Sequence, residues 1–276
     1  MNVSEKLERI ARQNESLLCI GLDPEWERIP PHLRASADPI FEFNRQLIDA
    51  THDLACAYKL QSACYEARGL DGLTALKRTL DYLRRAYPDL VTILDAKRGD
   101  IPNTNRFYAQ ALFEYWQADA TTVIAYTGLD ALEPFAAYSD RLTFVIVRSS
   151  NPGARDLQDL RVGERRLFEM LAEQLAALPY PNLGAVVGAT YPEDLKIVRA
   201  LGPDRWILVP GIGAQGGAVA DAVRAGASPN GGHLLLNASR SIIFASSGQD
   251  FAVAARLQAQ RLREEINAAR TVSQTS

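Results

Sequence analysis

Eight short apolar segments recur along the 276 residues, and a stretch of helical periodicity follows each of them. Apolar runs without a polar face indicate strands buried on both sides, as in a parallel sheet. Eight β/α units in a chain of this length predict a (β/α)₈ barrel. The expected strands cover residues 16–24, 55–61, 90–94, 120–126, 141–148, 182–189, 205–210 and 233–237. The expected helices cover 38–53, 71–86, 103–117, 164–176 and 250–268, with further helices starting at Leu129, Pro192 and about Gly217.

The lack of a linker indicates one domain. We expect an amphipathic helix over about 3–14 and a polar, frayed tail over about 270–276. No low-complexity segment divides the sequence, so the prediction is a single barrel domain over 1–276. An open, doubly wound sheet is the alternative arrangement for the same order of elements.

The charge balance and the cysteines limit the function classes. Lysine and arginine total 30 and aspartate and glutamate 33, a formal charge of −3, which points to neither a nucleic-acid nor a membrane partner. No signal peptide and no apolar run of membrane-spanning length is present, so we expect a cytoplasmic protein. Cys19, Cys56 and Cys64 form neither a disulfide framework nor a metal-ligand pattern with the three histidines. We expect them to be apolar core residues and predict no metal site.

The third expected strand ends in a charged segment. Asp95 and Lys97 share one face of a regular strand, and Asp100 follows Gly99, where we expect a tight turn. Barrel active sites lie at the C-terminal strand ends, where Lys59 also falls. Charges there must pair or take part in chemistry, so we predict a cluster in which lysines and carboxylates keep one another ionised. An ion-pair network that only closes the barrel is the structural alternative. Other polar residues expected at strand ends are Asp23, Gln61, Ser149, Ser150, Asn151, Asn237 and Ser239.

A glycine-rich segment follows the seventh expected strand, and an arginine follows the eighth. Residues 210–217 read Pro-Gly-Ile-Gly-Ala-Gln-Gly-Gly, and Arg240 comes just after 233–237. Glycines leave backbone N–H groups free to face an anion where a helix begins, and arginine binds phosphate with two hydrogen bonds. Because barrel enzymes often bind phosphate between these two loops, we predict a phosphate site. A glycine-rich segment alone is also compatible with a flexible turn.

Taken in this order, the motifs resemble the orotidine 5′-phosphate decarboxylase family in its longer bacterial form. The resemblance rests on Asp-Ala-Lys-Arg-Gly-Asp at 95–100, Val-Pro-Gly-Ile-Gly-Ala-Gln-Gly-Gly at 209–217 and Ala-Tyr-Lys-Leu-Gln at 57–61, and it extends over residues 21–241. Leu60 departs from the family pattern, in which proline is expected. The Asp-x-Lys-x-x-Asp element alone is shared with sugar-phosphate enzymes, so the combination of motifs carries the resemblance.

The resemblance implies an enzyme that decarboxylates orotidine 5′-monophosphate to UMP, the last step of de novo pyrimidine biosynthesis, without a cofactor. Lys97 would stabilise the developing carbanion and donate a proton to pyrimidine C6. The resemblance also implies a homodimer with shared active sites, in which Asp100 reaches the site of the neighbouring subunit. The catalytic residues would be Lys59, Asp95, Lys97 and Asp100, and the substrate-binding residues Asp23, Thr104, Ser149, Pro210, Gln215 and Arg240.

Each substrate group has its own implied contacts. Asp23 and Lys59 would hold the ribose hydroxyls, together with Asp100 and Thr104 from the partner. Ser149 would contact the pyrimidine, although the adjacent Ser150 is an alternative at this position. Gln215 and Arg240 would hold the phosphate. The loops at 149–162 and 211–217 would close over the substrate.

Two other functions remain open at this point. A related enzyme of metal-assisted sugar-phosphate chemistry, such as a hexulose-phosphate synthase, would share Asp95, Lys97 and Asp100 and require a divalent ion. A non-catalytic barrel that senses nucleotides is the second alternative. A chelator assay separates the first from the decarboxylase, and a turnover assay separates the second.

Overall fold

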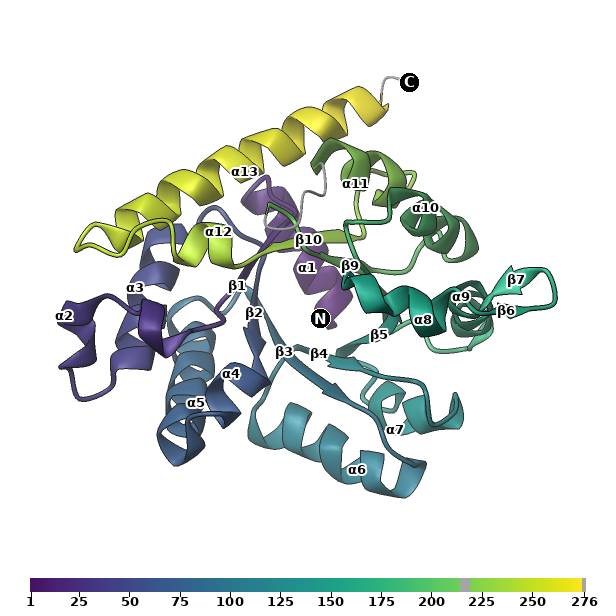
Figure 1. The fold of residues 1–276 in the computed structure, drawn as a ribbon, viewed down its shortest axis with the longest axis horizontal. Coiled ribbons are helices and arrows are strands. Elements are labelled where there is room, and N and C mark those ends of the chain that lie inside the picture. Colours follow the sequence, from purple (N-terminus) through teal and green to yellow (C-terminus); the bar gives the residue numbers. More distant parts are fainter. Residues whose placement is uncertain (214–218, 275–276) are drawn as a thin grey trace.

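The computed structural model describes residues 1–213 and 219–274, in which eight parallel strands close into a barrel (Figure 1). The strands pair in chain order, and the last pairs with the first, with Leu18 opposite Leu236. The closed barrel confirms the predicted fold, and the open-sheet alternative is wrong. The barrel strands are β1 (Leu18–Gly21), β2 (Ala57–Gln61), β3 (Val91–Arg98), β4 (Ala120–Val123), β5 (Leu142–Arg148), β8 (Leu183–Val187), β9 (Ile207–Pro210) and β10 (Leu234–Ala238).

Helices surround the barrel and connect successive strands (Figure 1). The longest, α13, lies across the strands that close the barrel, where it packs on α3, α11 and α12. The helices are α1 (Val3–Gln13), α2 (Pro31–Arg34), α3 (Pro39–Thr51), α4 (Ser62–Glu66), α5 (Gly69–Ala86), α6 (Pro102–Gln110), α7 (Glu133–Ala136), α8 (Arg155–Gln158), α9 (Leu167–Ala177), α10 (Pro192–Leu201), α11 (Val219–Gly226), α12 (Arg240–Ile243) and α13 (Phe251–Gln274). Single turns lie at Trp26–Arg28, Ala111–Tyr115, Asp130–Leu132 and Pro152–Ala154.

The C-terminal tail and the segment before α9 differ from the sequence expectation. The expected frayed tail is helical through Gln274, because Ile266 and Ala269 are buried and Asn267 donates a hydrogen bond to the carbonyl oxygen of Glu15. The helix expected from 164 begins instead at Leu167. Before it, β6 (Arg161–Val162) and β7 (Arg165–Arg166) form an antiparallel hairpin that turns at Gly163, whose φ of +65° suits glycine.

Helix α1 covers the N-terminal end of the barrel. Its first turn is capped reciprocally: the Asn2 side chain accepts the Glu5 N–H, and the Glu5 carboxylate accepts the Asn2 N–H. Ser4 accepts a hydrogen bond from Trp206 Nε1 at 2.7 Å, and Glu8 lies 3.1 Å from His233 Nε2. These contacts place α1 against the residues that directly precede β9 and β10.

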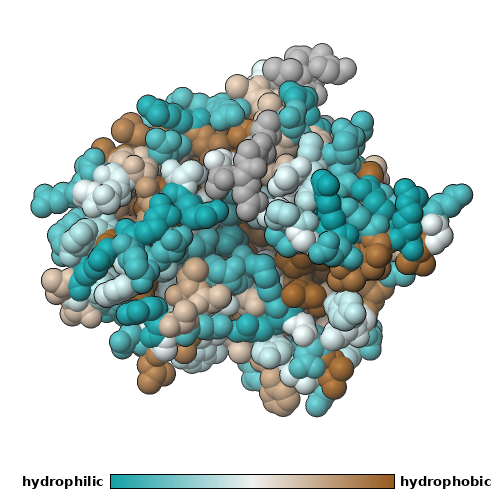
Figure 2. All heavy atoms as spheres, viewed as in Figure 1, coloured by the Kyte–Doolittle hydropathy of each residue, from teal (hydrophilic) through white to brown (hydrophobic). Residues whose placement is uncertain are grey.

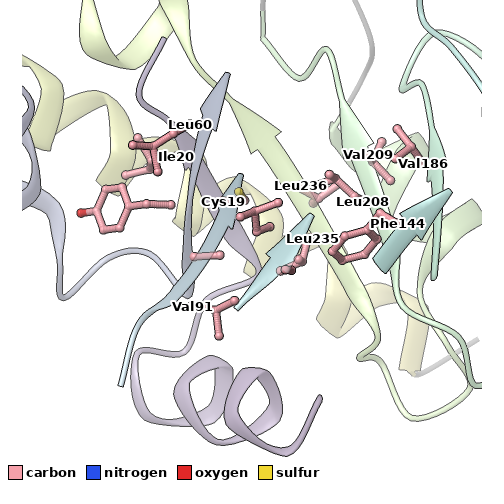
Figure 3. Close-up of a cluster of buried hydrophobic side chains, with 14 of the residues drawn as sticks. Cys19, Ile20, Leu60, Val91, Phe144, Val186, Leu208, Val209, Leu235 and Leu236 are labelled. Atoms are coloured by element: carbon pink, nitrogen blue, oxygen red, sulfur yellow. The ribbon is translucent and has the colours of Figure 1, made fainter. Parts of the chain in front are cut away.

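Apolar side chains from neighbouring strands fill the interior (Figure 3). Cys19, Val91, Phe144 and Leu235 are fully buried there. Cys56 is buried as well, and burial raises its pKa to about 12. These two cysteines are therefore core residues, as predicted.

Strand β3 is irregular where it carries the charged motif. Its pairing with β4 shifts register between Leu94 and Arg98, and Lys97 has a φ of +46°, in the left-handed region. A bulge of this kind redirects side chains. Gly99, where we expect a tight turn, directly follows the last residue of β3. Glycine is required there because a Cβ would lie 2.5 Å from the carbonyl oxygen of Ile124.

At the N-terminal end of the barrel, the buried side chain of Arg199 holds several loops together. Its guanidinium donates to five carbonyl oxygens at 2.7 to 3.1 Å. Burial lowers the pKa of Arg199 to about 10. The acceptors are the carbonyl oxygens of Gly202, Pro203, Arg205, Gly226 and His233.

Replacing Arg199 with methionine is expected to lower the free energy of unfolding by about 3 kcal/mol or more, because five carbonyl oxygens each lose a hydrogen bond. Urea unfolding followed by circular dichroism measures this loss. Lys196→Met on the same helix is the matched control, since Lys196 is exposed. Equal stability of the two variants would contradict the structural role of Arg199.

Candidate active site

The C-terminal ends of the strands surround a cavity of about 1340 Å³. Figure 2 shows a hollow in the middle of the visible face, with hydrophilic residues around it and hydrophobic residues between α7 and α9. The cavity therefore has a polar and an apolar side. The polar lining includes Asp23, Lys59, Gln61, Asp95, Lys97, Thr122, Ser149, Ser150, Asn237, Ser239 and Arg240. The apolar lining includes Ile124, Leu129, Leu157, Leu167, Phe168, Met170 and Leu171.

The carboxylate of Asp95 is the centre of the polar side. Its Oδ1 accepts hydrogen bonds from Lys97 Nζ at 2.6 Å and from Thr122 Oγ1 at 2.7 Å. Its Oδ2 accepts from Lys59 Nζ at 3.0 Å and from Gln61 Nε2 at 3.2 Å. A carboxylate offers about four lone-pair sites, so these four donors saturate Asp95 and fix its orientation.

The charges of this cluster keep one another ionised. Burial raises the pKa of Asp95, but Lys59 and Lys97 lower it by more, and the resulting pKa lies well below the ordinary value. Burial lowers the pKa of Lys59, whereas Asp23 and Asp95 raise it by more, so this pKa ends above its usual range. Asp95 is therefore anionic and Lys59 cationic at neutral pH.

The two lysines differ in access to the cavity. The Lys59 side chain is 5% exposed and the Lys97 side chain 43% exposed, although both contact the same carboxylate. Because the bulge in β3 directs Lys97 outward, its ammonium can reach a bound molecule while Asp95 still holds it. Lys97 thus presents a positive charge to the cavity.

Asp23 lies beside this cluster, just after β1. Its Oδ1 accepts the backbone N–H of Gln61 at 3.1 Å and lies 3.6 Å from Lys59 Nζ. Gly21 permits this close packing, since a Cβ there would lie 1.8 Å from Ser239 Oγ. Asp23 retains acceptor capacity toward the cavity, which suits hydroxyl groups.

Strands β9 and β10 supply the predicted phosphate side. Pro210, the last residue of β9, lines the cavity, and Gly211 and Gly213 follow with φ of +96° and +80°. Arg240 opens α12, is exposed and lines the cavity. Its guanidinium has no hydrogen bond or ion pair with any residue that the structure describes, so it is available to an anion. Gln215 lies outside the described residues.

Ser149 and Ser150, at the end of β5, both line the cavity. The backbone N–H of Ser149 donates to Gln158 Oε1, and Gln158 Nε2 donates to Ser149 Oγ, each at 3.0 Å. Gln158, at the end of α8, therefore occupies the polar groups of Ser149 in this structure. Gly188 accommodates Ser150, because a Cβ at Gly188 would lie 2.7 Å from Ser150 Cα.

The buried Arg148 anchors the segment that follows β5. Its Nε donates to Asp194 Oδ2 at 2.9 Å, and its Nη2 lies 2.9 Å from Asp159 Oδ1. Arg166 reaches Asp194 Oδ1, also at 2.9 Å. These ion pairs connect both ends of the expected 149–162 loop to α10.

Residues 16–255 match the family described as Orotidine 5'-phosphate decarboxylase / HUMPS family. The chain belongs to this family. A protein named orotidine 5'-phosphate decarboxylase from Cellvibrio japonicus is 47% identical over 98% of this chain and all of that protein. One of the same name from Thermomicrobium roseum is 48% identical over 96% of this chain and 95% of that protein.

Family members of known structure have the same fold. The OMP decarboxylase of Leishmania donovani superposes with a TM-score of 0.85 at 38% identity, over 98% of this chain and all of that one. The Leishmania donovani UMP synthase gives 0.87 at 40% identity, but this chain spans only 57% of its length. The predicted enzyme class, a carbon–carbon lyase of the carboxy-lyase type, is confirmed by the decarboxylase relatives.

The structure brings together most of the predicted site residues, but two lie elsewhere. Asp100 and Thr104 are half-buried near the start of α6, and neither lines the cavity of its own chain. The Asp100 carboxylate accepts only the N–H of Ile101 among the described residues. The residues that do line the cavity as predicted are Asp23, Lys59, Asp95, Lys97, Ser149, Pro210 and Arg240.

Sequence reasoning missed three contributors to the site. Thr122 and Gln158 were not singled out, and Cys64, expected in the core, is half-buried and lines the cavity. Burial, with the nearby Asp23, raises the pKa of the Cys64 thiol to about 11. The sequence offered a signal for Thr122 alone. Thr122 lies near the C-terminal end of β4, and predicted site residues also lie at or just after the C-terminal ends of the neighbouring strands β3 and β5.

Within residues 1–213 and 219–274, no three His, Cys, Asp or Glu side chains gather in a way that would hold a metal ion. In the same ranges no helix has both the length and the apolar composition needed to cross a membrane.

Proposed function

We propose that the chain decarboxylates orotidine 5′-monophosphate to UMP and CO₂ without a metal or organic cofactor. The observation that carries this proposal is the Asp95 carboxylate, saturated by donors that include a buried and an exposed lysine, in a cavity that Arg240 also lines. The Arg240 guanidinium is unpaired among the described residues. Membership of the family and relatives named for this activity support it. Cytoplasmic location stays a prediction.

In the proposed reaction, the pyrimidine carboxylate lies beside Asp95 and Lys97. Loss of CO₂ leaves an electron pair in the ring plane at C6, where no adjacent carbonyl group delocalises it. The Lys97 ammonium stabilises this charge electrostatically and then transfers a proton to C6. Asp95, held ionised by Lys59 and Lys97, orients the Lys97 ammonium until the transfer.

The remaining contacts follow from the same arrangement. Asp23 and Lys59 bind the ribose hydroxyls, and Pro210 and Arg240 lie on the phosphate side, where we place Gln215 as well. Ser149 contacts the pyrimidine, for which Gln158 must release it. Phosphate binding far from C6 then favours closure of the 149–162 and 211–217 loops and orients the base.

We further propose that two copies of the chain form a dimer with shared sites. Asp100 and Thr104 do not line the cavity of their own chain, and exposed apolar side chains that a second copy would cover lie near them in the sequence. Phe107 is 67% and Tyr126 81% exposed, and Thr127, next to Tyr126, donates a hydrogen bond to the Asp100 carbonyl. Across a two-fold axis, Asp100 and Thr104 would complete the partner's site.

Arg240→Ala is expected to lower kcat/KM for orotidine 5′-phosphate, because a charge-assisted clamp on phosphate is lost. The lower kcat/KM corresponds to a loss of about 2–5 kcal/mol in transition-state binding free energy. The loss should nearly vanish for the nucleoside orotidine, which has no phosphate. Steady-state kinetics on the two substrates measure this difference. Equal losses on both would show that Arg240 does not bind phosphate.

A chelator distinguishes the proposed decarboxylase from a related enzyme of metal-assisted sugar-phosphate chemistry. Dialysis against EDTA is expected to leave turnover of orotidine 5′-phosphate within about twofold of the untreated enzyme, because lysine side chains supply the positive charge. Loss of turnover that one divalent ion restores would instead favour sugar-phosphate chemistry. A hexulose-phosphate substrate, tested in parallel, should give no product. A barrel that only senses nucleotides would turn over neither substrate.

A further inference from the structure

The hydroxyl of Thr122 connects the two residues at the centre of the site. Thr122 Oγ1 lies 2.7 Å from Asp95 Oδ1 and 3.0 Å from the backbone nitrogen of Lys97. An ionised carboxylate only accepts hydrogen bonds and a backbone N–H only donates. The hydroxyl must therefore donate to Asp95 and accept from Lys97, which gives it a single orientation.

The bulge in β3 makes this hydroxyl necessary. Leu94 pairs with Thr121 and Arg98 with Val123, so β3 has two more residues than β4 between these pairs. The Lys97 N–H lies in the interrupted part of the ladder and is satisfied by Thr122 Oγ1. Lys97 also has the left-handed φ of +46°, which a non-glycine residue adopts only when its surroundings hold it there.

We infer that Thr122 is a positioning residue for the reaction: its hydroxyl holds the bulge, so that the Lys97 ammonium and the Asp95 carboxylate keep their relative positions at the cavity. This inference rests on the proposed function, because it assigns Lys97 and Asp95 to the chemistry. Without the hydroxyl, Asp95 loses one of four donors and the Lys97 backbone loses its restraint.

Thr121 offers a matched control for Thr122. It is the preceding residue of the same strand, is also buried and also bonds to β3, through Oγ1 to the carbonyl oxygen of Leu94 at 2.9 Å. Thr121 does not line the cavity and contacts neither Asp95 nor Lys97. Replacing either threonine with valine removes one buried hydroxyl from β4, but only one replacement affects the bulge.

The test compares Thr122→Val, Thr122→Ser and Thr121→Val with the unaltered chain. We expect Thr122→Val to lower kcat for orotidine 5′-phosphate by about 10- to 100-fold with KM within about threefold, since a hydrogen bond to a charged group is lost. Thr122→Ser should recover kcat to within about fivefold of the unaltered chain, because the hydroxyl is restored. Thr121→Val should keep kcat within about twofold even if urea unfolding shows a similar loss of stability.

A second readout follows proton transfer alone. In D₂O, UMP should exchange its C6 hydrogen for deuterium, a step that uses Lys97 but no CO₂, and Thr122→Val should slow this exchange as much as it slows kcat. Unchanged kcat in Thr122→Val, no recovery in Thr122→Ser, or an equal loss in Thr121→Val would each overturn the inference. If the unaltered chain itself gives no turnover, the proposed function fails, and this inference fails with it.

Discussion

Lys97→Ala is expected to lower kcat for orotidine 5′-phosphate by at least about 10⁴-fold, because one change removes both the cation beside C6 and the proton donor. Asp95 keeps three other donors, so the site should stay assembled. Single-turnover kinetics with the purified variant measure the chemical step without interference from product release.

The control for Lys97→Ala tests whether loss of any lysine charge, rather than loss of the charge in the cavity, lowers kcat. Lys196→Ala on α10 removes an exposed lysine and should leave kcat unchanged. UMP binding, measured by calorimetry, shows whether the Lys97→Ala cavity still accepts a nucleotide. A variant that binds UMP and retains kcat within tenfold would show that Lys97 is not the proton donor.

The second large effect is recovery of activity in mixed dimers. Lys97→Ala and Asp100→Ala are each expected to be nearly inactive alone, because the charge cluster functions as a unit. After subunit exchange, about half of the dimers are mixed, and each mixed dimer has one site with both changes and one with neither. Activity should therefore recover to roughly a quarter of the unaltered enzyme, counted over all sites.

Native mass spectrometry verifies the exchange in this experiment. It should show a dimer of unaltered chains and mixed dimers of the two variants. If mixed dimers form and activity stays at the level of the separate variants, Asp100 serves its own chain and the shared site is wrong. A chain that remains monomeric at the assay concentration contradicts the shared site as well.

The barrel and most of the site were predictable because their signals are local. Apolar runs identify the strands, and parallel strands of a barrel end on one face, so Lys59, Asp95 and Lys97 had to meet there. The cluster geometry confirms that expectation, although Lys97 reaches Asp95 from a bulge rather than from a regular strand.

The parts that sequence reasoning missed depend on register and tertiary contacts. Thr122 looks like an ordinary strand residue, because threonine favours strands for its branched side chain. Its role appears only once the pairing of β3 and β4 is known. The helical end of α13 likewise depends on packing, since Ile266 and Ala269 are buried against distant parts of the chain.

The most direct measurement of the proposed function uses the unaltered, EDTA-treated chain with orotidine 5′-phosphate in D₂O. Proton NMR and CO₂ detection follow the same sample. The proposed mechanism predicts one CO₂ released per UMP formed, with deuterium at C6, because Lys97 exchanges its ammonium protons with solvent before it donates one. Unchanged substrate, or UMP that carries hydrogen rather than deuterium at C6, would contradict it.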